Sequence, residues 1–274
     1  MLFLYLYLMK NLPIGVFDSG IGGLTVAHAL KEKLPNESIV YFGDTEHLPY
    51  GEKSDEAIQH FSKKITKFLI GKDCKAIVMA CNSASSVAFN VVKQQADHVP
   101  VFNVIDPIVA AVTNKCNDCK IGVIGTKTTI QSGVYRKKIQ SICNSAKVAS
   151  LATPLLVPMI EEGFINEKIS HQIIANYLSS PSLTNLDFLI LACTHYPLIH
   201  HEIAAFYNHK VNVIDSATIV AESILLALDN KGLLNNVKTP EYQFYVSNFT
   251  NSFSESAKFF FKEEIKIEQV NIWN

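Results

Sequence analysis

The sequence predicts an α/β protein made of two similar α/β domains, whose mostly parallel sheets face each other across a cleft. Two observations lead to this prediction. Short apolar runs alternate with segments of helical periodicity along most of the chain, which is typical of βα units around a parallel sheet. The order of these elements is then repeated, so that the second part of the chain resembles the first.

The first round of elements begins at Ile14. Each apolar run ends in polar residues or glycine, and a segment with helical spacing follows. The glycine-rich turn "DSGIGG" follows the first run, and the loop Thr45–Gly51 contains "HLPYG". We predict strands at 14–17, 39–42, 76–80 and 101–105, and helices at 24–34, 55–70 and 83–96.

The second round begins at Lys120 with "KIGVIGT", a strand that leads into a turn. We predict further strands at 146–152, 188–192 and 211–214, and helices at 130–141, within 154–163, at 167–178 and at 218–228. The C-terminal tail adds a strand in "QFYVSN" and a helix over 254–266.

The two rounds have the same order of features. Each opens with a glycine-containing strand end, "IGVFDSG" or "IGVIGT", and later places a cysteine after a buried apolar strand. Each is expected to end with a strand that carries an aspartate, in "VIDP" or "VIDS". We therefore predict a first domain at 9–105 plus 215–274, to which the C-terminal segment returns, and a second domain at 106–214.

The composition is that of an ordinary globular protein with a small-molecule substrate. The 274 residues are 48% apolar and 18% charged, with a formal net charge of −1. This excludes the basic stripe of a nucleic-acid-binding protein and the polybasic patch of a membrane-bound one. Six cysteines are too few and too scattered for a disulfide scaffold, so we expect reduced thiols and a cytoplasmic location.

The N-terminal segment "MLFLYLYLM" is an apolar run that is too short to span a bilayer, for which about 20 residues are needed. It lacks the basic region and the cleavage site of a signal peptide. Met9 is followed by polar residues and then by the first predicted strand. We therefore interpret Met9 as the natural start of the chain.

Two cysteines occupy equivalent places in the two rounds. Cys81 follows the strand at 76–80 in "IVMACNSAS", and Cys193 follows the strand at 188–192 in "LILACTHYP". Ligands of open α/β sheets bind at the carboxyl ends of the strands. Asp18 and Thr126 also stand at such ends, so both thiols are expected to face one cleft.

Two thiols on opposite sides of a carbon acid can invert its configuration. One thiolate removes a proton from one face, and the opposite thiol supplies a proton to the other face. Cysteine suits this chemistry because its pKa, about 8.5, is easily tuned toward neutrality. Each thiol needs a polar neighbour, for which Asp18, Glu161 and His195 are candidates. A cysteine after a buried strand can also be a small packing residue, but the duplicated placement favours chemistry.

Other motifs carry less information. Cys116 and Cys119, in the polar segment "NKCNDCK", have no second pair that would complete a zinc site, and we interpret them as part of a surface loop. We interpret Cys74 and Cys143 as packing residues. The glycines of "DSGIGGL" fit neither the dinucleotide fingerprint nor the P-loop. Their backbone amides could hold a phosphate or a carboxylate equally well.

Several segments resemble the glutamate racemases of the cofactor-independent aspartate/glutamate racemase superfamily. They are "IGVFDSGIGGLTV", "YFGDTEHLPYGEKS", "VMACNSAS", "IGVIGT", "VPMIEEG" and "LACTHYPLI". The resemblance implies two α/β domains with the active site between them, and catalysis without PLP, metal or nucleotide. It also implies glutamate as substrate, a homodimer, and a supply of D-glutamate for peptidoglycan and hence for cell shape. Some members are controlled by a cell-wall precursor.

The resemblance also implies roles for individual residues. Cys81 and Cys193 would be the proton-transfer thiols, with Asp18 assisting Cys81, and with Glu161 and His195 assisting Cys193. The implied substrate contacts are Asp18, Ser19, Tyr50, Gly51, Asn82, Ser83, Thr194 and His195. Thr126 joins this binding set because it follows a strand.

The sequence departs from the family pattern at two positions. Ser83 stands where threonine is usual, and Ala192 stands where glycine is usual, beside the second thiol. Hydroxyls, side-chain amides and backbone amides at helix starts suit a carboxylate substrate, but they do not distinguish glutamate from aspartate. An aspartate or other amino-acid racemase remains an alternative, and so does a non-catalytic protein that binds an anion in the same cleft.

Overall fold

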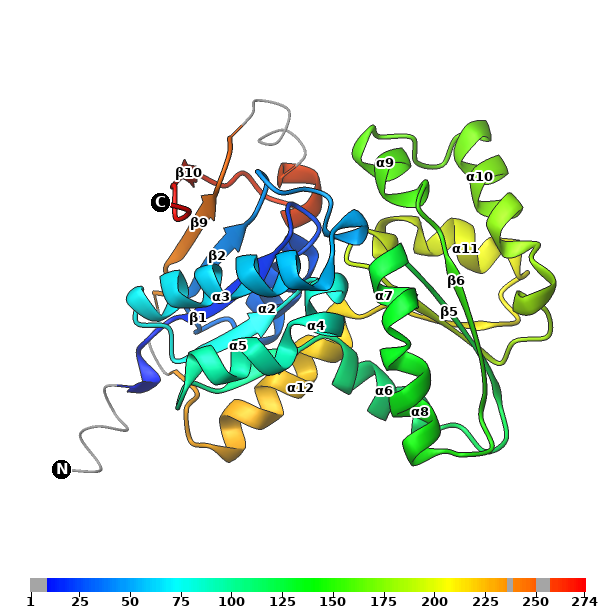
Figure 1. The fold of residues 1–274 in the computed structure, drawn as a ribbon, viewed down its shortest axis with the longest axis horizontal. Helices are drawn as coiled ribbons and strands as arrows, with labels where there is room; N and C mark the ends of the chain where they lie inside the picture. The colour runs from blue at the N-terminus through cyan, green and yellow to red at the C-terminus, as the bar shows by residue number, and fades with distance from the viewer. Residues whose placement is uncertain (1–8, 236–238, 250–256) are drawn as a thin grey trace.

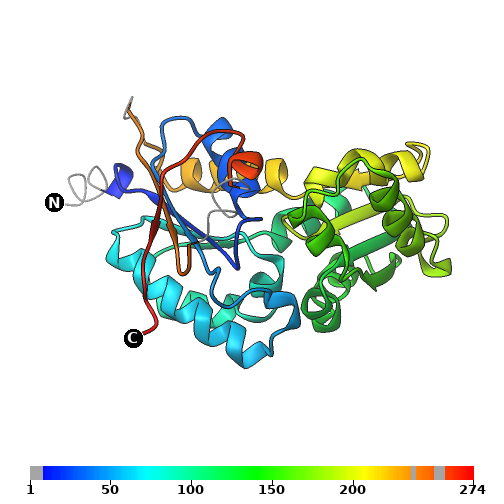
Figure 2. The same cartoon turned by 90° about the horizontal axis from the view of Figure 1, so that it is seen from above.

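The described part of the chain forms two lobes, each built on one parallel β-sheet (Figure 1). This computed structural model describes residues 9–235, 239–249 and 257–274. Figure 2 shows the two lobes lying side by side. The predicted fold class of two α/β units with parallel sheets is confirmed. In these ranges no helix has both the length and the apolar character that crossing a bilayer requires.

The sheet of the first lobe has six strands in the order β10-β9-β2-β1-β3-β4, and all neighbouring pairs are parallel. The strands are β1 (Ile14–Asp18), β2 (Ile39–Gly43), β3 (Ala76–Met79), β4 (Val101–Asn103), β9 (Tyr242–Val246) and β10 (Ile267–Gln269). Strands β1, β2 and β3 are buried along their whole length, as expected for a parallel sheet covered by helices. The C-terminal strands therefore return to the first lobe.

Helices cover both faces of this sheet. They are α2 (Leu24–Lys33), the 3₁₀ turn η1 (Tyr50–Glu52), α3 (Asp55–Gly71), α4 (Asn82–Val87), α5 (Phe89–Ala96) and α12 (Ala217–Asn230). The apolar stripe of α3 runs through Ile58, Ile65 and Leu69, which are buried because the helix lies on the sheet. On the other side α12 packs against α2.

The sheet of the second lobe has four parallel strands in the order β6-β5-β7-β8. The strands are β5 (Lys120–Gly125), β6 (Lys147–Ala152), β7 (Phe188–Ala192) and β8 (Asn212–Ile214). The helices are α6 (Ile105–Thr113), α7 (Lys127–Ser132), α8 (Val134–Ile142), α9 (Leu156–Glu161), α10 (Lys168–Leu178) and α11 (His200–Phe206), with 3₁₀ turns η2 (Pro181–Leu183) and η3 (Tyr196–Ile199). Helix α6 packs against both α8 and α12, and so connects the lobes.

Two predicted helices are each divided into two. The helix expected at 83–96 consists of α4 and α5, which meet at Ala88 with φ −114° and ψ −2°. The helix expected at 130–141 starts earlier, and Gly133 separates α7 from α8 with φ +64°. Glycine adopts this left-handed conformation without the steric cost of a Cβ atom, so the break occurs there.

The strand predicted at 101–105 is wrong at its C-terminal end. Strand β4 ends at Asn103, whose Oδ1 atom accepts the backbone N–H groups of Ile105 and Asp106, each at 2.9 Å. A side-chain oxygen that accepts such N–H groups favours the start of a helix. Asp106 therefore lies in the first turn of α6, and the expected match between "VIDP" and "VIDS" fails in the first round.

The expectation of reduced thiols is wrong for two of the six cysteines. Cys116 and Cys119 form a disulfide in the segment between α6 and β5, with their Cα atoms 5.5 Å apart. That separation lies in the usual range for a disulfide. Cys143 is half-buried, with its Sγ atom 3.8 Å from that of Cys116. Cys74 is buried in an apolar cluster, as predicted.

Two expectations concern residues outside the described ranges. Residues 1–8, on which the interpretation of Met9 depends, lie outside them. Of the helix predicted at 254–266, residues 254–256 also lie outside, whereas 257–261 are helical. Strand β10 follows shortly after, and the sequence reasoning missed it.

Candidate active site

A pocket of about 330 Å³ lies between the two lobes, at the carboxyl ends of β3, β5 and β7. Both Cys81 and Cys193 line it. All remaining predicted site residues except Asp18 line the same pocket. Parallel strands place their carboxyl ends at one edge of a sheet, and the two lobes turn these edges toward each other.

The thiol of Cys81 lies where β3 leads into α4. Its Sγ atom accepts the backbone N–H of Ala84 at 3.5 Å, and the thiol donates to Ser19 Oγ at 3.6 Å. Burial raises the pKa of Cys81 to about 12, and the nearby charge of Asp18 adds to this rise. Cys81 is therefore a protonated thiol at neutral pH and can donate a proton.

Asp18 is the last residue of β1 and is fully buried, outside the pocket lining. Its Oδ2 atom accepts the backbone N–H of Gly20 at 3.0 Å, whereas Oδ1 has no hydrogen-bond partner among the described residues. Burial raises the pKa of the Asp18 carboxyl, although the charge of His195 acts in the opposite direction. This carboxyl can exchange a proton with a neighbour, but it does not form part of the pocket surface.

The second thiol, Cys193, has an imidazole and a carboxylate as neighbours. Its Sγ atom lies 3.8 Å from Nδ1 of His195, and Nε2 of His195 lies 2.9 Å from Oε1 of Glu161. Burial would lower the pKa of His195, but its contacts with Cys193 and Glu161 raise it to about 10. His195 is therefore an imidazolium at neutral pH, and it can stabilise a thiolate at Cys193.

The glycine-rich turn after β1 has a packing role at Gly22. A Cβ atom at this position would overlap the His195 ring and the Thr194 hydroxyl. Only glycine allows the turn to approach the second lobe so closely. The turn therefore helps to hold His195, which the sequence reasoning did not anticipate.

Hydrogen-bond donors from both lobes line the same pocket. Tyr135 Oη donates to Asn82 Oδ1 at 2.7 Å, and Asn82 Nδ2 then has no partner among the described residues. Ser83 Oγ and Thr126 Oγ1 lie 2.9 Å apart and connect the lobes. An amide nitrogen and hydroxyls in this arrangement suit the oxygens of a carboxylate. The sequence reasoning missed Tyr135, because nothing local distinguishes it from any other helical tyrosine.

The turn η1 forms another part of the wall. The carbonyl of Tyr50 accepts Thr128 Oγ1 at 3.2 Å, and the carboxylate of Glu52 pairs with Lys127 Nζ at 3.0 Å. Both contacts join the two lobes beside the pocket. The sequence reasoning also missed several other wall residues: Leu48, Pro49, Thr153, Pro154, Val157 and Pro158.

Among the residues that the structure describes, there is no group of three or more His, Cys, Asp or Glu side chains that could hold a metal ion. In the pocket, His195 pairs with Glu161, and the sulfur of Cys81 accepts the backbone N–H of Ala84.

Comparisons with known proteins give the family. The Asp/Glu/Hydantoin racemase family model matches residues 23–224. A glutamate racemase of Neisseria gonorrhoeae is 40% identical over 265 residues, which cover 96% of this chain and 98% of that protein.

Solved structures agree with this assignment. Glutamate racemase from Francisella tularensis, in complex with D-glutamate, matches with a TM-score of 0.92 and 41% identity, over 96% of this chain and 99% of that one. The Escherichia coli enzyme, in complex with L-glutamate and the activator UDP-MurNAc-Ala, has a TM-score of 0.79 over 95% and 98% of the two chains, but at 23% identity it supports the fold alone. The resemblance to glutamate racemases is confirmed by the first two relatives, and the chain belongs to the Asp/Glu/Hydantoin racemase family.

Proposed function

We propose that the chain is a glutamate racemase, an isomerase that interconverts L- and D-glutamate with two cysteines as bases and without PLP. The observation that carries the proposal is that Cys81 and Cys193 line one pocket in different chemical surroundings. Burial favours the thiol form of Cys81, whereas Cys193 lies 3.8 Å from Nδ1 of His195, whose pKa is raised to about 10. In this proposal Cys81 is the acid and Cys193 the base, and both face the same pocket.

In the proposed mechanism the α-carbon of glutamate lies between the two sulfurs. The thiolate of Cys193 takes the α-proton, and the thiol of Cys81 supplies a proton to the opposite face of the carbanion. Cys193 is then a thiol and Cys81 a thiolate, so the reverse reaction uses the same groups with exchanged roles. The proposal assigns to Asp18 the exchange of a proton with Cys81, on which its charge acts, and to His195 and Glu161 the support of the charge at Cys193.

The substrate carboxylates find donors on several walls. The proposal assigns them to the Asn82 amide, to the hydroxyls of Ser83 and Thr126, and to the backbone N–H groups of Tyr50 and Gly51. The proposal also gives Ser19 and Thr194 hydroxyl contacts with the substrate. Donors around the α-carboxylate also stabilise the negative charge that develops when the α-proton leaves. Glutamate, rather than aspartate, is inferred from the relatives, which are glutamate racemases.

The wider role follows from the family resemblance. We propose that the protein supplies D-glutamate for peptidoglycan in the cytoplasm, acts as a homodimer, and responds to a cell-wall precursor. We also keep the division into 9–105 plus 215–274 and 106–214 as a proposal. It is supported by β9 and β10, which pair with the first sheet rather than the second.

The proposed function is tested by incubating the pure protein with L-glutamate or L-aspartate without PLP, and by following the optical signal in circular dichroism. We expect the signal of L-glutamate to decay toward zero and that of L-aspartate to stay unchanged. If the signal of L-aspartate decays faster than that of L-glutamate, aspartate is the substrate instead. Binding of glutamate without any loss of signal would favour the non-catalytic alternative.

A further inference from the structure

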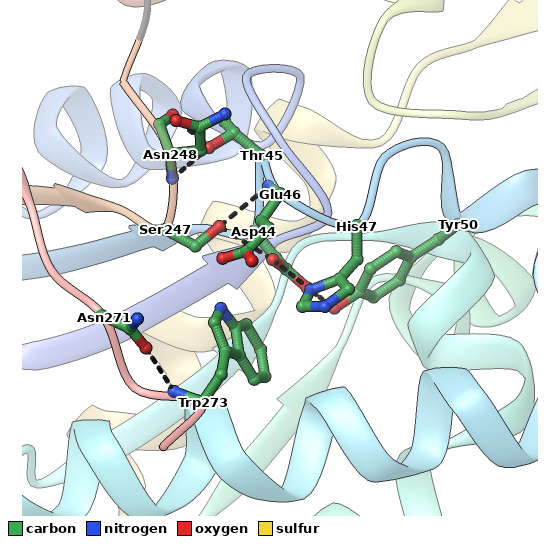
Figure 3. Close-up of polar contacts among 9 residues, drawn as sticks. All are labelled: Asp44, Thr45, Glu46, His47, Tyr50, Ser247, Asn248, Asn271 and Trp273. Carbon is green, nitrogen blue, oxygen red and sulfur yellow. Dashed lines mark hydrogen bonds and ion pairs between the residues drawn. The ribbon is translucent and has the colours of Figure 1, made fainter.

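A fully buried carboxylate, that of Asp44, lies directly behind the η1 wall of the pocket. It follows β2 and accepts Tyr50 Oη at 2.7 Å through Oδ2 (Figure 3). Nδ1 of His47 lies 2.9 Å from Oδ1 and 3.0 Å from Oδ2 of the same carboxylate. Ser247 Oγ donates to Oδ1 at 2.9 Å.

Three donors therefore converge on one buried charge. Hydrogen bonds to an ionised group are stronger than neutral ones, and a buried set of them fixes the positions of all its members. His47 immediately precedes the wall segment Leu48–Glu52, and Tyr50 lies within it. The carboxylate of Asp44 thus holds this wall at its start and at its middle.

The C-terminal part of the chain completes the cluster. Ser247 follows β9, and its Oγ atom also accepts the backbone N–H of Glu46 at 2.9 Å. Trp273 packs edge-on against the His47 ring, with centroids 4.5 Å apart, while Phe61 stacks on the same ring at 3.9 Å. The imidazole is therefore enclosed by two aromatic side chains as well as bonded to the carboxylate.

A second pair of contacts keeps the two segments aligned. The backbone N–H of Asn248 donates to Thr45 Oγ1 at 2.8 Å, and Thr45 Oγ1 donates to the Asn248 carbonyl. Near the C-terminus, Asn271 Oδ1 accepts the backbone N–H of Trp273 at 2.8 Å (Figure 3). Segments about 200 residues apart in the sequence thus form one rigid support behind the pocket.

We propose that Asp44 is a positioning residue, which fixes the Leu48–Glu52 wall for substrate binding through the Tyr50 hydroxyl. The C-terminal segment supports it through Ser247 and through Trp273. This inference rests on the proposed function, because the wall that Asp44 holds is the one that binds glutamate there.

The cluster acts on binding and takes no part in proton transfer. Burial raises the pKa of Tyr50 well above its usual value, and the charge of Asp44 raises it further. Tyr50 therefore stays protonated and donates to Asp44. This inference assigns the backbone donors of the wall to the side-chain carboxylate of glutamate, whose charge is the same in substrate and transition state. A displaced wall therefore weakens both states alike and leaves both thiols in place. Such a change raises KM and leaves kcat unchanged.

The kinetic test uses Asp44→Asn, Tyr50→Phe and the double variant. Asn retains the shape of Asp44 but loses the charge, and Phe retains the ring of Tyr50 but loses the donor. We expect each single variant to raise KM for L-glutamate about tenfold, with kcat within about threefold of the wild-type value. Because both act through one hydrogen bond, the double variant should raise KM no further than the larger single effect. Tyr245→Phe is the matched control, since its hydroxyl contacts Gln243 and Lys72 instead.

A second readout does not depend on activity. Trp273 is the single tryptophan of the chain, so its fluorescence reports directly on the cluster. We expect Asp44→Asn to shift the emission of Trp273 to longer wavelength, because His47 loses its anchor and water reaches the indole. Tyr245→Phe should leave the emission unchanged.

The outcomes separate the two proposals. A wild-type protein that does not racemise glutamate would reject the proposed function, while the emission of Trp273 in Asp44→Asn would still decide the role of the cluster. Unchanged emission in that variant overturns the inference. So does an unchanged KM in both single variants, a loss of kcat with KM unchanged, or a double variant whose effects multiply.

Discussion

The Nε2 atom of His195 lies 2.9 Å from the Oε1 atom of Glu161, and this contact makes the two thiols of the pocket unequal. It holds the imidazole so that Nδ1 faces Cys193 at 3.8 Å. No imidazole contacts Cys81 among the described hydrogen bonds, and its neighbour Asp18 disfavours the thiolate. The proposed base, Cys193, therefore lies beside a cation, whereas burial and the charge of Asp18 keep the proposed proton donor, Cys81, in its thiol form.

Cys81→Ser and Cys193→Ser should each lower the rate of racemisation by about 10³-fold or more, because a serine hydroxyl is a far weaker acid than a thiol. The measurement is the decay of the circular-dichroism signal of L-glutamate and, separately, of D-glutamate. Each variant should still eliminate a leaving group from a suitable glutamate analogue, since that reaction needs one base.

Cys143→Ser is the matched control for these variants, since Cys143 is also a free cysteine but lies outside the pocket. Its racemisation rate should equal that of the wild type. Full activity in either pocket variant would contradict the two-base mechanism.

Glu161→Gln should change the pH dependence of kcat/KM. The contacts of His195 with Cys193 and Glu161 raise its pKa to about 10, so wild-type activity should fall only as the pH approaches that value. Removing the carboxylate charge favours the neutral imidazole at lower pH. We expect the descending limb of the profile to move about one pH unit toward neutrality. A limb at the same pH in both proteins would show that Glu161 does not support His195.

The same contact makes a pH-dependent contribution to the free energy of unfolding. The folded-state pKa of His195 lies above the usual value of 6.5, so the stabilisation is fully present below pH 6.5 and is lost as the pH rises through about 10. Urea unfolding at several pH values should show that Glu161→Gln destabilises the protein most near pH 6 and least above pH 10. A difference that grows with pH would have the wrong sign for this account.

Ala192→Gly should affect stability more than catalysis. The methyl group of Ala192 lies toward Gly125 of the neighbouring strand β5, and the residue is fully buried. Its removal takes away one buried carbon and adds backbone freedom to a strand, which together cost about 1.5 kcal/mol. Thermal unfolding should show this loss of stability, while kcat/KM should stay within about threefold of the wild-type value. A large gain in rate would show instead that the methyl crowds Cys193.

Reduction of the Cys116–Cys119 disulfide should leave racemisation unchanged. The disulfide lies just before the start of β5, and the pocket residue Thr126 follows the end of that strand. A strand of six residues spans roughly 20 Å, so the disulfide is far from the pocket. The closed loop is short, so reduction should cost about 2 kcal/mol or less. Mass spectrometry of alkylated, unreduced protein should find four free thiols. Six alkylated cysteines would contradict the disulfide.

The strand ends of the candidate site could be predicted from the sequence because they are local features. Apolar runs that end in polar residues mark Cys81, Thr126 and Cys193, and parallel strands bring such ends to one edge of each sheet. The disulfide is also local in sequence, but the spacing of Cys116 and Cys119 alone does not show whether the bond forms.

The remaining parts depend on contacts between distant segments. Asp44 and Ser247 are 203 residues apart, and they meet because β9 pairs with β2. Tyr135 reaches Asn82 only because the two lobes close on each other. No periodicity within one segment records which strand becomes a neighbour, so the support behind η1 became visible only in the structure.

The most direct test of the central claim uses deuterium oxide. The pure protein is incubated with L-glutamate without PLP, and the two enantiomers are separated early in the reaction for mass analysis. Two bases predict one deuterium at the α-carbon of nearly all D-glutamate formed, while the remaining L-glutamate carries almost none. Equal early labelling of both enantiomers, or D-glutamate that retains the original α-hydrogen, would contradict the account of Cys81 and Cys193 as opposed acid and base.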